Sequence, residues 1–368
     1  MPFTTIDDPQ AHMQVQLYSA NNTAIGSGGL AVTLDGDTNM QPDFVWIKCR
    51  NQTYSHSAFD SVRGAQKGLY PDLNATQATH TDQLSSFDAD GFTLGSSRDV
   101  NGESTARPYI AWTWQAGGAP SGSLGDISSS GTGAGTITGA SDTGWGYVSS
   151  ATNITQSVNQ NNGFSITKFQ GAASGCAFPH NLGGTPGFIM IKNLDDTQVW
   201  SVWHPNLTAT SGYRLQLDDN GTETSGQYYS TAPSSTTITC GSDDGNGGST
   251  HNFICYAWKP VSGFSAFGTY AGGTTDKTLD LDFFPRFFMT KRINGSAHWV
   301  IVDTFRSSAS SSGDSMLPYL VSNNNETEAS SNDRIDLYES GSTKGVQFKS
   351  TDNYTNQSGG TYVYVAFA

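Results

Sequence analysis

The sequence predicts an all-β protein in which one chain of 368 residues forms three related antiparallel β-sandwich units of jelly-roll-like type. Three observations predict this fold. A heptad that runs from proline to lysine occurs three times, at 42–48, 186–192 and 285–291. No long run of residues has the apolar spacing of an amphipathic helix. The composition, with 42 glycines and 11% aromatic residues, is typical of short strands joined by many turns.

The heptad is one landmark of a longer repeat. An apolar run follows each copy, at 109–114, 253–258 and 362–367. The heptad proline and the last aromatic residue of that run are 72 positions apart in the first two copies (114 − 42 and 258 − 186) and 82 apart in the third (367 − 285). Aromatic-rich runs lie between them, and matched runs precede the second and third heptads. Four landmarks in one order indicate an internal repeat of roughly 100 residues, large enough for each copy to have its own core.

The heptads read as strands that are covered on both faces. In the first copy Phe44, Trp46 and Lys48 share one face of a strand, and Val45 and Ile47 share the other. Aromatic or β-branched residues occupy both faces, which favours a central strand of a sandwich. The leading proline suits the first position of a strand, where its missing N–H removes no ladder hydrogen bond.

The repeats divide the chain into residues 1–116, 163–260 and 261–368, with a linker rich in glycine, serine and threonine at 117–162. Trp145 and Tyr147 interrupt this linker. They are expected to pin it to a neighbouring unit, with contact to another chain as the alternative. The second and third units are joined by only five residues (259–263), so the linkers are unequal in length. Unequal linkers favour an open row of units over a closed ring with pseudo-threefold symmetry.

Charge and hydropathy exclude several classes of partner. The formal net charge of −14 repels phosphate backbones, so we expect no nucleic-acid binding. No apolar stretch approaches the roughly 20 residues of a membrane-spanning helix, and we expect no membrane insertion. The first residues have neither a basic region nor an apolar core, so no secretory signal is predicted. The four cysteines have no paired spacing, and free buried thiols are preferred over a disulfide framework.

The search for chemistry starts from residues that repeat with the fold. Asp60 and Arg63 match Asp303 and Arg306, but the second copy lacks the pair, which favours structural ion pairs over reacting groups. A lysine closes every heptad and is expected to extend its amine to solvent from a strand end: Lys48, Lys192 and Lys291. Three histidines fall in similar regions of the copies without metal-ligand spacing: His56, His204 and His298.

No motif for catalysis, phosphate binding or dinucleotide binding is present, so the sequence predicts no catalytic residue, no cofactor and no metal site. The acidic glycine-rich stretches at 34–37, 88–91 and 242–248 read as turns, because none continues into the ligand spacing of a calcium loop. A carboxylate pair assembled by folding stays open as an alternative.

The run from residue 42 to 101, followed by the strand at 109–114, resembles a repeat of virion proteins from marine bacteriophages, including phages of cyanobacteria and of pelagic bacteria. The two ends of the chain, "FTTIDDPQAHMQVQLYSA" and "GGTYVYVAFA", also look like the ends of that family. The resemblance implies a non-enzymatic structural protein of the virion, made in the host cytoplasm. A tail fibre or spike for host attachment or particle assembly is the first expectation. A capsid decoration protein and a glycan-degrading tail enzyme are the alternatives.

Such a role implies other virion proteins as partners, with a host surface glycan and further copies of this chain as candidate partners. Sugar-binding surfaces place aromatic faces beside amide and carboxylate groups. Tyr228 and Tyr229, in a predicted loop, are the candidate ligand-binding residues, although a subunit interface would have the same composition.

Overall fold

The computed structural model describes residues 6–102, 106–125, 127, 130–137, 149–306, 318–329, 334–349 and 352–368. Within these ranges the regular structure is β-strand, apart from two short 3-10 helices, η1 (Pro9–Ala11) and η2 (Ile25–Ser27). None of the helices in these ranges is long and apolar enough to cross a membrane. The all-β prediction is therefore confirmed.

Three antiparallel sheets share one strand order. Unit 1 has β1 (Met13–Ser19), β9 (Pro108–Trp114), β3 (Phe44–Cys49) and β4 (Ser57–Asp60). Unit 2 has β10 (Thr132–Ile137), β11 (Thr152–Asn159), β12 (Phe164–Gln170), β19 (Asn252–Trp258), β14 (Phe188–Asn193), β15 (Ser201–Trp203), β16 (Tyr213–Gln216) and β17 (Thr224–Ser225). Unit 3 has β20 (Ser265–Ala271), β27 (Thr361–Phe367), β22 (Phe287–Arg292), β23 (Val300–Asp303) and β24 (Leu320–Val321). In each sheet the last strand of the unit (β9, β19 or β27) lies between an early strand (β1, β12 or β20) and the heptad strand (β3, β14 or β22).

A smaller sheet accompanies each main sheet. In unit 1 it contains β2 (Leu30–Thr33), β8 (Gly91–Leu94) and β7 (Leu84–Asp88), with a separate pair β5 (Lys67–Gly68) and β6 (Ala78–Thr79). In unit 2 it contains only β13 (Ala177–Pro179) and β18 (Thr237–Thr239). In unit 3 it contains β21 (Lys277–Asp280), β26 (Thr343–Phe348) and β25 (Ile335–Ser340).

The heptad strands of units 1 and 2 each separate two cores, whereas in unit 3 Phe287 and Phe288, on opposite faces of the strand, belong to one continuous cluster. Val45 and Ile47 join a cluster with residues of β2, β7 and β8, so the smaller sheet of unit 1 packs on this outer face. Phe44 and Trp46 point the other way, into a cluster that contains residues of all three units. Unit 2 has the same division, with Ile189 and Ile191 outside and Phe188 and Met190 inside. The predicted burial of both faces is confirmed.

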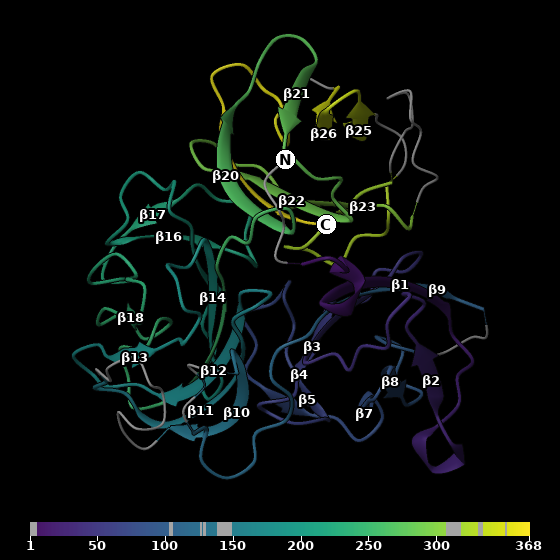
Figure 1. The fold of residues 1–368 in the computed structure, drawn as a ribbon, viewed down its shortest axis with the longest axis vertical. Helices are drawn as coiled ribbons and strands as arrows, with labels where there is room; N and C mark the ends of the chain where they lie inside the picture. The colour runs from purple at the N-terminus through teal and green to yellow at the C-terminus, as the bar shows by residue number, and fades with distance from the viewer. Residues whose placement is uncertain are drawn as a thin grey trace.

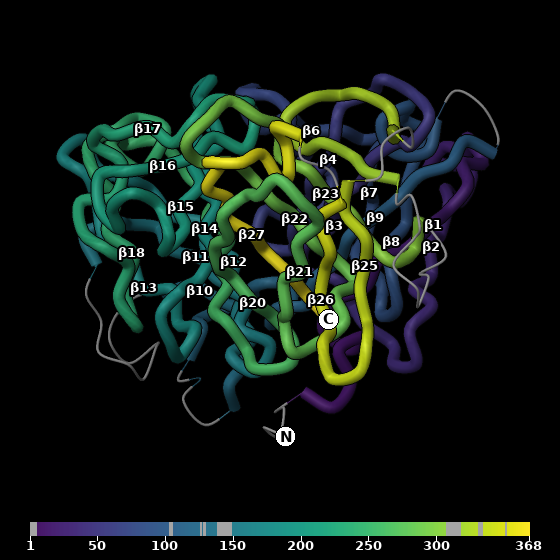
Figure 2. The backbone as a smooth tube through the Cα atoms, turned by 90° about the horizontal axis from the view of Figure 1, so that it is seen from above, coloured from purple at the N-terminus to yellow at the C-terminus, as the bar shows by residue number. Residues whose placement is uncertain are grey.

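The three units close into a ring around the inner cluster (Figure 1). Seen from above, unit 2 lies on the left and unit 1 on the right, and unit 3 lies in front between them at the same height (Figure 2). The prediction of an open row is therefore wrong. In a row the inner aromatic face of each main sheet would be exposed to water, whereas the ring buries all three faces at once.

The predicted linker at 117–162 is also wrong, because parts of it belong to unit 2. Strands β10 and β11 form a hairpin that pairs with β12 and extends the main sheet to eight strands. Ile154 and Val158 lie on one face of β11 and are buried with Leu124, Ile127 and Ile137. These few apolar residues are enough because the hairpin covers a strand edge and the rim of an existing core. Trp145 and Tyr147 lie outside the described residues.

Candidate functional site

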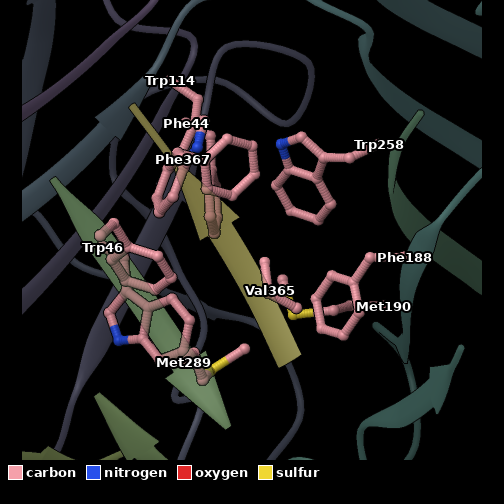
Figure 3. A pocket seen from close by; sticks show the side chains of 10 residues that line it. Phe44, Trp46, Trp114, Phe188, Met190, Trp258, Met289, Val365 and Phe367 are labelled. Atoms are coloured by element: carbon pink, nitrogen blue, oxygen red, sulfur yellow. The ribbon is translucent and has the colours of Figure 1, made fainter. Parts of the chain in front are cut away.

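The centre of the ring is an aromatic cluster with no room for a ligand (Figure 3). Equivalent positions of the three units supply nine of its lining residues, and Val365 is the tenth: Phe44, Trp46, Trp114, Phe188, Met190, Trp258, Phe287, Met289, Phe367 and Val365. The ring of Trp114 meets those of Trp258 and Phe287 edge-on, at centroid distances of 6.0 and 5.5 Å. The space left is about 10 Å³, close to the smallest that holds one water. The centre is therefore a packed core.

The heptad lysines lie around this core and connect the units. All three are fully buried, so the expectation of solvent-directed amines is wrong. Each Nζ donates to a backbone carbonyl of a neighbouring unit: Lys48 to Asn325 (3.3 Å), Lys192 to Asn74 (3.0 Å) and Lys291 to Gly221 (2.6 Å). Each also donates to a carbonyl of its own unit. The three bonds run in one direction around the ring, from unit 1 to 3, from 3 to 2 and from 2 to 1.

Burial changes the proton affinity of these lysines. Removal from water lowers the pKa of Lys48 and Lys192 to about 8, and that of Lys291 to about 7. Nearby carboxylates, such as Asp219 beside Lys291, raise the pKa only in part. Their contacts are backbone carbonyls, which accept hydrogen bonds from either protonation state.

A second set of bonds repeats with the threefold pattern. Eight positions after each heptad lysine, the N–H of an imidazole or indole side chain donates to a carbonyl of the neighbouring unit. The bonds are His56 to Val321 (3.1 Å), Trp200 to Tyr70 (2.9 Å) and Trp299 to Gln216 (2.8 Å). Trp46 Nε1 donates to His56 Nδ1 (2.9 Å), which leaves the proton of the neutral imidazole on Nε2. Burial lowers the pKa of His56 well below its usual value, so the ring stays neutral.

The third set involves the predicted ion pairs. Asp60 binds Arg63, and Asp303 binds Arg306 at 2.7 Å, with all four side chains at most 1% exposed. Tyr256 of unit 2 donates its hydroxyl to Asp60 (2.6 Å). In the same way Trp112 of unit 1 donates to Asp303 (3.1 Å). The expectation of ion pairs is confirmed, and both pairs lie at junctions between units.

Unit 2 has His204 at the position of the two aspartates. Its Nδ1 accepts from the Asn206 N–H (3.2 Å), so its Nε2 donates to Tyr364 O of unit 3 (3.3 Å). His298, by contrast, contacts Asn323 of its own unit. The three histidines therefore hold three different positions. In the described part of the chain no group of histidine, cysteine and acidic residues could hold a metal ion.

The two tyrosines predicted to bind a ligand differ from each other. Tyr229 is 1% exposed and packs on Trp203 with ring centroids 6.4 Å apart, so its inclusion in a surface site is wrong. Tyr228 is half-buried, and the guanidinium of Arg214 lies 3.8 Å from the centroid of its ring. Alternation along an extended segment explains the difference, because neighbouring side chains point to opposite sides. Tyr228 stays a candidate.

The carboxylates of two acidic turns accept hydrogen bonds from nearby groups. Asp88 accepts from the hydroxyls of Ser86 and Thr93, both at 2.7 Å. Asp243 accepts from the Gly245 N–H and from Arg214, both at 2.9 Å. These carboxylates stabilise turns, in agreement with the sequence interpretation.

Two open grooves lie where heptad strands begin and unit-ending strands finish. One, of about 290 Å³, has polar walls from Asp43, Gln115 and Asn159 at the junction of units 1 and 2. The other, of about 500 Å³, is lined by Phe284, Arg286 and Phe305 of unit 3 among others. Arg286 and Asp43 each directly follow a heptad proline, so the two grooves occupy equivalent places in units 3 and 1. A basic residue lines one groove and an acidic residue lines the other.

Comparison with known proteins gives one family. A family model described as "Domain of unknown function (DUF7483)" matches residues 8–155 and again residues 138–368. No curated protein and no solved structure matches the chain. The two matches agree with an internally repeated β-rich chain. On these matches, which together span nearly all of the sequence, the chain belongs to the DUF7483 family.

Proposed function

We propose that this protein is a non-enzymatic structural component of a bacteriophage virion, displayed on the exterior as a tail fibre, spike or similar part that serves host attachment or particle assembly. The observation that carries the proposal is the ring itself. The features that all three units share are contacts between units: the buried lysines, the imidazole and indole N–H donors, and the aromatic centre. The resemblance to phage virion proteins supports the proposed place in a bacteriophage particle.

We further propose that the three units are copies of one jelly-roll-like β-sandwich that arose by triplication. The shared order of the four central strands supports this. So does register, because the heptad phenylalanine faces the last aromatic residue of its own unit in all three sheets: Phe44 and Trp114, Phe188 and Trp258, Phe287 and Phe367.

The proposed partners are other virion proteins, with host surface glycans and further copies of this chain as candidates. A ring with its apolar faces turned inward presents polar outer surfaces, and the chain carries a net charge of −14. Such a surface repels nucleic acid and suits hydrogen-bonded contacts with protein or sugar.

Cryo-electron microscopy of the intact virion tests the proposal. A ring-shaped density fitted by this fold on the tail would support it. A particle that lacks the protein in both the map and its mass spectrum would overturn it.

A capsid decoration protein is the second candidate, and pseudo-threefold symmetry favours it. A monomer with three similar units can occupy a threefold position of a shell and meet each surrounding subunit with an equivalent surface. Density at threefold positions of the capsid, in the same map, would select this candidate over a tail protein.

A glycan-degrading tail enzyme is the rival from another class. Purified protein incubated with host polysaccharide would then release new reducing ends steadily with time. Sustained release would refute the non-enzymatic proposal, whereas binding without release would agree with it.

A further inference from the structure

Unit 2 contains three of the four cysteines, and two of them face each other. All four are free and buried. Cys176 directly precedes β13 and Cys240 directly follows β18, the two strands of the smaller sheet of this unit. Because Ala177 pairs with Thr239, the next pair outward is Cys176 with Cys240. The two cysteines therefore lie opposite each other across an antiparallel ladder.

The backbone geometry is compatible with a covalent bond. The Cys240 N–H donates to Cys176 O at 2.7 Å, which is one of the two bonds that define a hydrogen-bonded cross-strand pair. In such pairs the Cα atoms are about 5.5 Å apart, inside the range of about 4.4–6.8 Å that disulfides span.

The two side chains also point to one place. A Cβ atom built on Gly247 would lie 3.2 Å from the sulfur of Cys176 and 3.2 Å from that of Cys240. Gly247 has a φ of +99°, so glycine both permits this loop conformation and leaves the space over the sulfurs free. Burial raises the pKa of Cys240 well above its usual value, and the neighbouring thiol of Cys176 raises it further.

We propose that Cys176 and Cys240 are a redox-active pair that forms an intramolecular disulfide in the folded protein when a low-molecular-weight disulfide such as oxidised glutathione is present. One thiolate attacks a glutathione sulfur and releases one reduced glutathione. The second protein thiolate then attacks the mixed disulfide, forms the protein S–S bond and releases the second. Two protein thiols are oxidised and one glutathione disulfide is reduced, with both thiol protons accepted by the departing glutathione thiolates.

The location gives the bond a structural role. The smaller sheet has three strands in units 1 and 3 but only two in unit 2, where β13 and β18 have three residues each. A two-stranded ladder is marginal alone. A disulfide at its end would close the chain from 176 to 240 and stabilise this short two-stranded sheet by restricting the unfolded chain. If the virion role holds, the bond would form after release from the reducing cytoplasm.

The experiment exposes the full-length native protein to oxidised glutathione, blocks the remaining thiols with a maleimide and maps the bonds by mass spectrometry without reduction. We expect two of the four thiols to be lost, one Cys176–Cys240 crosslink, and an unfolding temperature a few degrees above that of the reduced protein. High pH should speed the reaction, because the attacking species is the thiolate.

Cys240→Ser should abolish both the crosslink and the rise in unfolding temperature. Cys255→Ser is the matched control, since Cys255 is buried in the same core but lies on β19 of the facing sheet, and this variant should oxidise like the parent. Four free thiols after exposure, a glutathione adduct that does not resolve, or a crosslink through Cys255 would each overturn the proposal.

Discussion

The amine of Lys192 donates a hydrogen bond of 3.0 Å to the carbonyl oxygen of Asn74, which belongs to another unit of the ring. The lysine side chain is fully buried, and Gln198 O also accepts from it, at 2.5 Å. Two more lysines make the corresponding bonds at the other two junctions. A strand-end lysine therefore acts three times as the polar connection between neighbouring units.

Replacing Lys291 with methionine should destabilise the ring. Methionine fills similar space but leaves the carbonyls of Gly221 and Arg292 without this donor. A buried acceptor left unpaired costs about 1–3 kcal/mol, so we expect a loss of that size in the free energy of unfolding measured with denaturant. Lys344→Met is the matched control, because that side chain is 43% exposed. Equal stability of the two variants would contradict a connecting role for Lys291.

The same lysines should make stability rise with pH above neutrality. Burial holds the pKa at about 7 for Lys291 and about 8 for Lys48 and Lys192, against 10.5 for an ordinary lysine. Between these values the unfolded chain binds more protons than the folded one, so the free energy of unfolding increases as pH rises from about 7 towards 10. Denaturant titrations of the parent and Lys291→Met across this range should show a shallower rise in the variant. Parallel curves would count against a depressed pKa.

Acid should destabilise the protein through its buried histidines. Burial lowers the pKa of His180 to about 4 and that of His204 to about 3, against 6.5 for a free histidine. Their contribution is present above pH 6.5 and is lost as pH falls through the folded values, because the unfolded chain takes up the protons. Each histidine adds a slope of up to about 1.4 kcal/mol per pH unit. His180→Gln should flatten the stability curve between pH 6 and 4, and an unchanged slope would refute this assignment.

Much of the fold can be predicted from the repeated residues of the heptads. The heptad alternation predicts two buried faces because Phe44 and Trp46 alternate with Val45 and Ile47, and the structure has a core on each side. The ring N–H donors were missed because the equivalent residues differ in type. A signal existed, since each stands eight positions after a heptad lysine: His56, Trp200 and Trp299 (56 − 48, 200 − 192 and 299 − 291).

Other features leave no readable trace in the sequence. The lysines bind backbone carbonyls, such as that of Asn74, and any residue type can supply a carbonyl. The sequence therefore does not distinguish a strand-end lysine whose amine donates to water from one whose amine donates to a neighbouring unit. The hairpin of β10 and β11 was missed for a related reason. Its glycine-rich composition is typical of a flexible linker. The segment forms strands because β11 pairs with the edge of β12.

The candidate sugar site now depends on Tyr228 alone. Tyr229→Ala removes a buried ring and should cost about 3 kcal/mol of stability, so any loss of binding in that variant would reflect damage to the core. Tyr228→Ala removes a half-buried ring that Arg214 covers and should cost about 1 kcal/mol at most from the cation–π contact. A glycan array should therefore compare the parent with Tyr228→Ala, after both are shown to be folded. Equal binding would remove Tyr228 from the site.

Small-angle X-ray scattering should distinguish a ring from a row in solution. A compact body of 368 residues has a radius of gyration of about 21 Å, whereas separate units joined end to end would give a clearly larger value. We expect the compact value, because one aromatic cluster packs Trp114, Trp258 and Phe367 of three units against one another. Replacing Trp258 with aspartate places a charge in that cluster and should increase the radius while the sheets persist by circular dichroism. A parent protein with the larger radius would show that the units do not close on themselves.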